Sequence, residues 1–115
     1  MKTLIIALSI ALAGCTSGVG FAPITPVAAS QCAAFLLKVP VKTELPAVEY
    51  SDGLIYTPRY GWVKGLWEPG KNQITVAVNY QMDETITEEM AHFYGVTDPA
   101  ARRIGERVRE CETFM

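Results

Sequence analysis

A short apolar run at the N-terminus limits how much of this chain can fold into a domain. The run extends from Leu4 to Ala13, follows the cationic Lys2 and leads into small residues. A cationic start, an apolar stretch and a small-residue exit form the layout of a secretory signal. With about ten residues, the run is too short to cross a bilayer roughly 30 Å thick as a permanent helix. We therefore predict that residues 1–14 are a signal peptide that is removed during export.

The end of this run is more specific than an ordinary cleavage site. Residues Leu12-Ala13-Gly14-Cys15 resemble the bacterial lipobox, in which the cysteine thiol is acylated before the chain is cleaved on its N-terminal side. The resemblance implies a mature chain that starts at an acylated Cys15. The alternative is a plain secretory signal with a coincidental cysteine. Because each buried methylene contributes about 0.8 kcal/mol, several acyl chains together hold a protein on a membrane without spanning it.

The residue after the anchor and the charge balance indicate where the protein works. Thr16 follows Cys15, and this resembles the Gram-negative sorting signal for the outer membrane, which implies a lipoprotein of the cell envelope that faces the periplasm. The formal net charge is only −2, and the basic residues are scattered among acids. A chain without a basic stripe lacks the surface that binds nucleic-acid phosphates. We expect a membrane and an envelope protein or peptide as partners, and no nucleic acid.

Two further cysteines, Cys32 and Cys111, lie near opposite ends of the mature chain. Exported proteins meet an oxidising compartment, so we expect these two cysteines to form a disulfide. Closing a loop of about 80 residues contributes roughly 4 kcal/mol in the chain-entropy model. The alternative is a thiolate metal site, which the absence of C-x-x-C spacing disfavours.

The mature chain has the length and the apolar content of one small domain. Residues 15–27 are small, apolar or Gly, Ser and Pro, so we expect a flexible tether that leaves residues 28–115 as the domain. A first helix or extended segment is expected over residues 28–38, with Ser30 as its N-cap. The proline-containing stretch that follows, residues 41–52, fits an irregular path or an edge strand.

The middle of the chain has the pattern of strands. A short strand is expected over residues 54–57, and a turn at residues 68–72 predicts a hairpin. The second arm of this hairpin, residues 73–80, alternates apolar and polar residues, which is typical of a strand with one buried face.

Two helices are expected to close the sequence. Thr85 and Glu88 have capping-box spacing and predict a helix over residues 86–94 that Gly95 ends. Asp98 is expected to cap the second helix, whose apolar stripe is Ala101, Ile104, Val108 and Cys111. Together these elements predict an α+β domain: a small antiparallel sheet of about three strands with two C-terminal helices packed on it.

The predicted strand and the helix after it resemble the core of the zincins, which are zinc-dependent metallopeptidases. In that family an edge strand precedes a helix that bears H-E-x-x-H, where two histidines bind zinc and the glutamate activates water. Here the motif reads Glu88-Glu89-x-x-His92. The resemblance implies that Glu89 is the general base and that His92 is a zinc ligand, with Glu88 in place of the first histidine.

This departure from the motif excludes a standard zincin site. His92 is the one histidine in the chain, whereas a catalytic zinc takes at least two imidazoles or one imidazole plus thiolates. A carboxylate-rich site remains open because Glu88 and His92 share one helix face. The acidic candidates for a third ligand are Asp98, Glu106 and Glu110, and spacing selects none of them. Alternatively, these residues serve the helix macrodipole, with acids near its start and a histidine near its end.

Aromatic residues gather around the predicted hairpin. Tyr60, Trp62 and Trp67 either fill the core of the small sheet or form a surface that binds a partner. Two hypotheses of function follow. The first is an envelope lipoprotein with a degenerate zincin-like core, which binds zinc or another metal and has residual or lost peptidase activity. The second is a non-enzymatic lipoprotein that binds an envelope or receptor partner through its aromatic hairpin.

Overall fold

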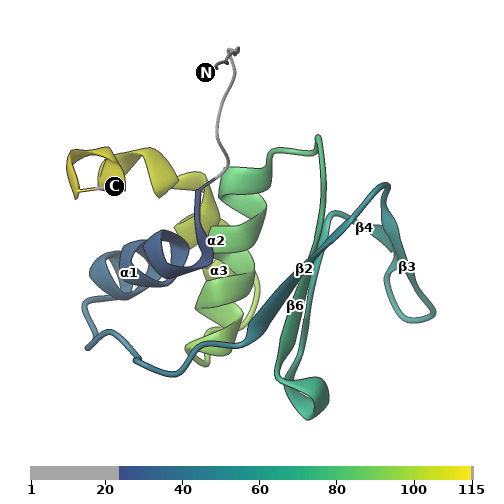
Figure 1. Ribbon diagram of the computed structural model, residues 1–115, viewed down its shortest axis with the longest axis horizontal. Coiled ribbons are helices and arrows are strands. Elements are labelled where there is room, and N and C mark those ends of the chain that lie inside the picture. Colours follow the sequence, from purple (N-terminus) through teal and green to yellow (C-terminus); the bar gives the residue numbers. More distant parts are fainter. Residues whose placement is uncertain (1–23, 115) are drawn as a thin grey trace, which may run out of the picture.

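The computed structural model describes residues 24–114 (Figure 1). The predicted signal peptide, the predicted lipid attachment at Cys15 and most of the expected tether lie outside these residues. The helices are α1 (Pro26–Leu37), α2 (Met82–Phe93), α3 (Ala100–Glu106) and the 3-10 helices η1 (Pro69–Lys71) and η2 (Val108–Phe114). The strands are β2 (Ala47–Ser51), β3 (Ile55–Thr57), β4 (Gly61–Val63), β5 (Gly65–Glu68) and β6 (Gln73–Ala77). Within residues 24–114, every helix is too short or too polar to cross a membrane.

The α+β class is confirmed: a three-stranded sheet is covered by helices, and the C-terminal helices belong to this layer. The strand order is β2-β6-β5, with a separate two-stranded β3–β4 hairpin. The sheet is mixed and not antiparallel, because β6 pairs antiparallel with β5 but parallel with β2. The tight turn of η1 forces β5 and β6 to run in opposite directions. The chain between β2 and β6 is long enough to bring β6 back parallel to β2.

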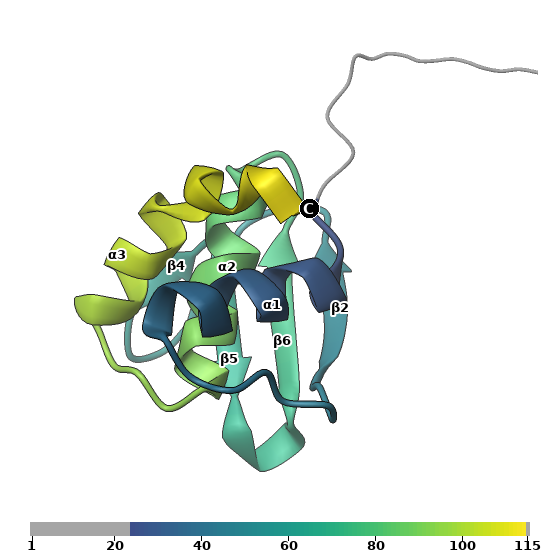
Figure 2. The ribbon, with the colours of Figure 1, turned by 90° about the vertical axis from the view of Figure 1, so that its left-hand side faces the viewer.

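The helical layer lies on one face of the sheet, with α1 and α2 packed against each other (Figures 1 and 2). Ile74 and Val76 of β6 are fully buried beneath it, as the alternating pattern predicts. The expected disulfide is present and joins Cys32 of α1 to Cys111 of η2. The apolar stripe that contains Cys111 is buried along its whole length, although the α-helix ends at Glu106 and continues as 3-10 turns.

The start of α1 differs from the sequence-based expectation. The helix begins at Pro26, two residues inside the expected tether, because Pro suits the first helical position. The cap is Thr25, whose hydroxyl accepts the N–H of Ala28. Ser30 is not the cap: it is buried inside α1, and its hydroxyl lies 2.8 Å from the hydroxyl of Tyr94.

The start of α2 also differs from the prediction. The helix begins at Met82, so Thr85 lies inside it and donates its hydroxyl to the carbonyl of Tyr80. The predicted end is confirmed, since Gly95 follows the helix with a φ of 100°. Asp98 does not cap α3, whose preceding residue is Pro99.

Helix α3 packs closely on α2, and this contact sets the position of the loop between them. Gly105 makes the approach possible: a Cβ there would lie 2.6 Å from the backbone oxygen of Glu84 and 3.0 Å from Cβ of Glu88. The α2–α3 connection is thereby held beside the end of α2 that carries His92.

Candidate metal centre

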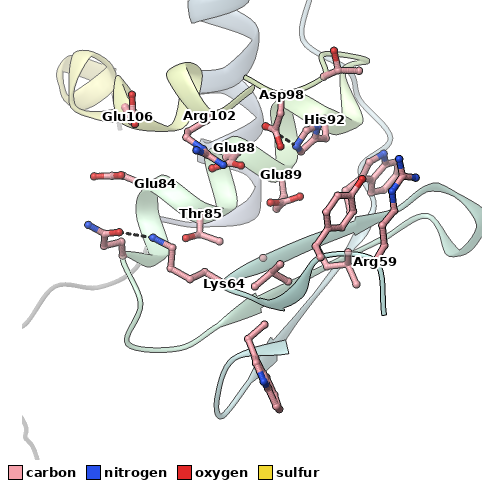
Figure 3. Close-up of a pocket in the computed structure, with 18 of the residues that line it drawn as sticks. Arg59, Lys64, Glu84, Thr85, Glu88, Glu89, His92, Asp98, Arg102 and Glu106 are labelled. Atoms are coloured by element: carbon pink, nitrogen blue, oxygen red, sulfur yellow. Dashed lines mark hydrogen bonds and ion pairs between the residues drawn. The ribbon is translucent and has the colours of Figure 1, made fainter. Parts of the chain in front are cut away.

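A cleft lies between β4 and β5 on one side and α2 and α3 on the other (Figure 3). Helix α2 contributes Glu88, Glu89 and His92 to it, the α2–α3 connection contributes Asp98, and α3 contributes Arg102. The β3–β4 hairpin provides the opposite wall, with Tyr60 and Trp62 among its residues. The three residues of the zincin-like motif therefore line one open depression, together with Asp98, one of the three acidic candidates that spacing alone does not separate.

Glu88, Glu89 and His92 converge. One potential ligand atom from each residue lies within 4.8 Å of those of the other two. Helical geometry explains part of this, because residues one turn apart share a face. Glu89 is the next residue after Glu88 and does not share its helix face, so helical spacing alone does not explain why its carboxylate lies within this distance. These three residues form the acid–imidazole cluster.

His92 is held in a defined orientation. Its Nδ1 lies 2.8 Å from the carbonyl oxygen of Val96. A carbonyl only accepts hydrogen bonds, so Nδ1 carries a proton, and in the neutral form of the ring the lone pair lies on Nε2. That Nε2 lies 3.4 Å from Oδ1 of Asp98, on the cleft side. Metal-binding histidines commonly show this arrangement, in which the second ring nitrogen donates to a backbone carbonyl.

Glu89 is buried against strand β5. The residue is 6% exposed. Strand β5 approaches it at Gly65, where a Cβ would lie 3.0 Å from Oε2 of Glu89 and 2.5 Å from Cγ2 of Thr85. Burial is the largest cause that raises the pKa of Glu89, to about 8, followed by the charges of Glu88 and Asp98. The backbone N–H of Trp67 acts in the opposite direction. A buried carboxyl with a raised pKa inside a cleft is typical of functional sites.

Glu88 is half-buried and its pKa is also raised, first by desolvation and then by the charge of Asp98. His92, Arg102 and Lys64 lower it. Arg102 extends from α3 toward Glu88 in Figure 3, while Lys64 donates to the side chain of Gln81 at 2.7 Å. Burial, together with the charge of Asp98, thus outweighs the effect of the nearby cations on the pKa of Glu88.

The donor set fits a divalent metal ion. Carboxylate oxygens and a neutral imidazole are ligands that zinc and other divalent transition metals accept. Glu88 and His92 supply two such donors, and the carboxylate of Asp98 faces the imidazole, with Oδ1 3.4 Å from Nε2 of His92. The two other acidic candidates are placed differently. Glu110 pairs with Arg107 at 2.8 Å, and Glu106 lines the cleft outside the cluster.

The aromatic residues fall into two groups. Trp62 and Tyr60 are 66% and 65% exposed on the hairpin, and Tyr56 packs edge-to-face on Trp62. Trp67 is partly buried and packs edge-to-face on Phe93 of α2, with ring centroids 5.5 Å apart. The three aromatic residues singled out from the sequence all line the cleft, but Tyr60 and Trp62 are exposed on the hairpin whereas Trp67 also packs against the core.

Comparisons with known protein families, curated proteins and solved structures found no match to this chain.

Proposed function

We propose that this chain is a lipid-anchored protein of the bacterial cell envelope whose domain binds a divalent metal ion in the cleft. The observation that carries the metal site is the acid–imidazole cluster, with its donor atoms within 4.8 Å of one another and the Nδ1 of His92 bonded to a backbone carbonyl. The ligands in this proposal are Glu88 and His92 of the cluster together with Asp98, whose Oδ1 lies 3.4 Å from Nε2 of His92; Glu89 has a separate role. The lipid anchor rests on the lipobox-like residues that end at Cys15.

The proposal also gives Glu89 the role of a general base. A divalent cation in such a site activates water and polarises a carbonyl group. Glu89 lies beside the proposed ligands, and its ionised form would be the carboxylate placed to accept a proton from such a water. Because burial raises the pKa of Glu89 to about 8, a bound cation would be needed to favour that ionised form near neutral pH. The zincin resemblance assigns the general base to the same residue, so peptide hydrolysis is the reaction class that this cleft would support.

Metal content tests the central claim. The exported protein is expected to hold about one equivalent of zinc, measured by mass spectrometry after dialysis against micromolar zinc. His92→Ala and Glu88→Gln are expected to weaken zinc binding about 100-fold, because loss of a ligand exceeds the loss from removing an outer-shell partner. Glu84→Gln is the matched control, one turn earlier on α2 in the same cleft, and should retain the metal. A parent protein that stays empty would contradict the proposal.

A second candidate function is favoured by the exposed aromatic residues of the β3–β4 hairpin. Tyr56, Tyr60 and Trp62 are each at least 60% exposed, and large exposed aromatics are enriched at sites of protein recognition. In this alternative the hairpin binds an envelope protein, and the acid–imidazole cluster has a structural role.

Site-specific photo-crosslinking in intact cells tests this alternative. A photoreactive residue at Trp62 is expected to give one discrete protein adduct, since this side chain is the most exposed of the three. The same residue at Lys71, which is exposed in the turn between β5 and β6, should give none. Identical adducts at both positions, or no adduct at Trp62, would exclude a specific hairpin partner.

A further inference from the structure

Helix α1 has an outward face unlike that of an ordinary surface helix. None of its twelve residues is charged, and its inward side is buried in the core. The outward stripe consists of Val27, Gln31 and Phe35, spaced four residues apart. Val27 is 57% and Phe35 is 56% exposed. A helix that faces water normally places polar and charged residues on that side.

Exposed apolar residues also follow the end of α1. Val39 and Val41 are 41% and 51% exposed, and they lie between exposed Lys38 and Lys42 in the segment Lys38-Val39-Pro40-Val41-Lys42. Apolar side chains beside lysines suit the boundary of a bilayer, because the former enter the acyl region while ammonium groups reach the headgroup phosphates. Lys42 also lies over the ring of Phe93, which leaves Lys38 as the cation on the outer side.

The position of α1 in the chain identifies the surface that it would meet. Nine residues, 15–23, separate the proposed anchor from the start of the described chain at Ile24. A segment of this length spans at most about 30 Å. Helix α1 starts two residues later, so it is the element that the anchor holds nearest to the membrane.

The cleft lies on another side of the molecule. Figure 1 shows α1 and the β3–β4 hairpin at opposite ends of the view, and Figure 2, which faces α1, places β4 behind the helices. A surface that contacts the outward face of α1 therefore leaves the hairpin wall of the cleft uncovered.

We infer that α1 lies on the phospholipid bilayer that carries the anchor, with Val27, Phe35, Val39 and Val41 in the headgroup region. This inference rests on the lipid anchor of the proposed function. It adds an orientation: the cleft opens into the periplasm, on the side away from the anchoring membrane. A soluble or envelope-bound ligand can enter the cleft from that side.

Fluorescence quenching in vesicles tests this orientation. The lipidated protein is reconstituted into phosphatidylethanolamine–phosphatidylglycerol vesicles whose acyl chains are brominated near the headgroup. The chain has two tryptophans, Trp62 and Trp67, and both line the cleft, so the unsubstituted protein should lose no emission. Phe35→Trp and, as a second reporter on the same stripe, Val27→Trp should each lose the emission of the added indole. Tyr56→Trp, an equally exposed position on the hairpin, is the matched control and should lose none.

The outcomes separate the orientation from the anchor. A protein that does not float with the vesicles overturns the lipid anchor and this inference with it. A protein that floats, but whose reporters at positions 27 and 35 are not quenched, overturns only the docking of α1. Quenching in the unsubstituted protein would also overturn it, because the hairpin side would then face the bilayer.

Discussion

Replacing Cys32 and Cys111 with alanine is expected to lower the free energy of unfolding by about 4 kcal/mol. The disulfide joins residues 79 positions apart, so it encloses the whole sheet, α2 and α3. Its removal restores to the unfolded chain the entropy of a long open loop. Small domains are stable by about 5–15 kcal/mol in total, so this single bond accounts for a large share of that stability.

Urea denaturation followed by circular dichroism measures this loss. Both cysteines are fully buried, so alanine also leaves space in the core. Unfolding of the unsubstituted protein with and without dithiothreitol removes the bond while keeping both sulfur atoms, and it should give most of the effect. A shift below about 1 kcal/mol would mean that the unfolded chain is already compact without the bond.

The local elements are predictable from sequence because each is specified by a pattern within a few residues. The disulfide is predictable because two cysteines in an exported domain are expected to be oxidised. The alternation of Ile74 and Val76 predicts a strand, and the turn before it predicts its antiparallel partner. The parallel pairing of β2 with β6 is not predictable in this way. It joins Ala47 to Gln73, across a hairpin and another strand, and a short segment of strand-forming residues carries no signal for a distant partner.

The candidate site, like the fold, is only partly predictable from the sequence. Helical spacing alone is enough to predict that Glu88 and His92 share one face. The place of Asp98 cannot be deduced from spacing, because it depends on how the chain turns at Gly95 and on the close contact of α3 at Gly105. The burial of Glu89 likewise depends on the approach of strand β5 to α2. Contacts between elements, rather than patterns within them, decide the chemistry of this cleft.

In the metal-free protein, stability is expected to fall as the pH rises from about 5 to about 8. The pKa of Glu89 is about 8 in the folded state against 4.5 for the free side chain, so the folded protein binds more protons in this range. The stabilisation is complete below the lower pKa and is lost as the pH rises through the higher one. Because Glu89 is buried and each pKa unit corresponds to about 1.4 kcal/mol, the loss amounts to a few kcal/mol.

Chemical denaturation in the presence of EDTA at pH 5, 7 and 9 measures this slope. Glu89→Gln keeps the size and the polarity of the side chain but cannot ionise. The variant should therefore match the unsubstituted protein near pH 5 and exceed its stability by a few kcal/mol at pH 9. Glu106→Gln changes an exposed carboxylate at the edge of the same cleft and should preserve the slope. If Glu89→Gln kept the full pH dependence, the carboxyl of Glu89 would have to be ionised in the folded protein already at pH 5, and burial against β5 would not govern its charge.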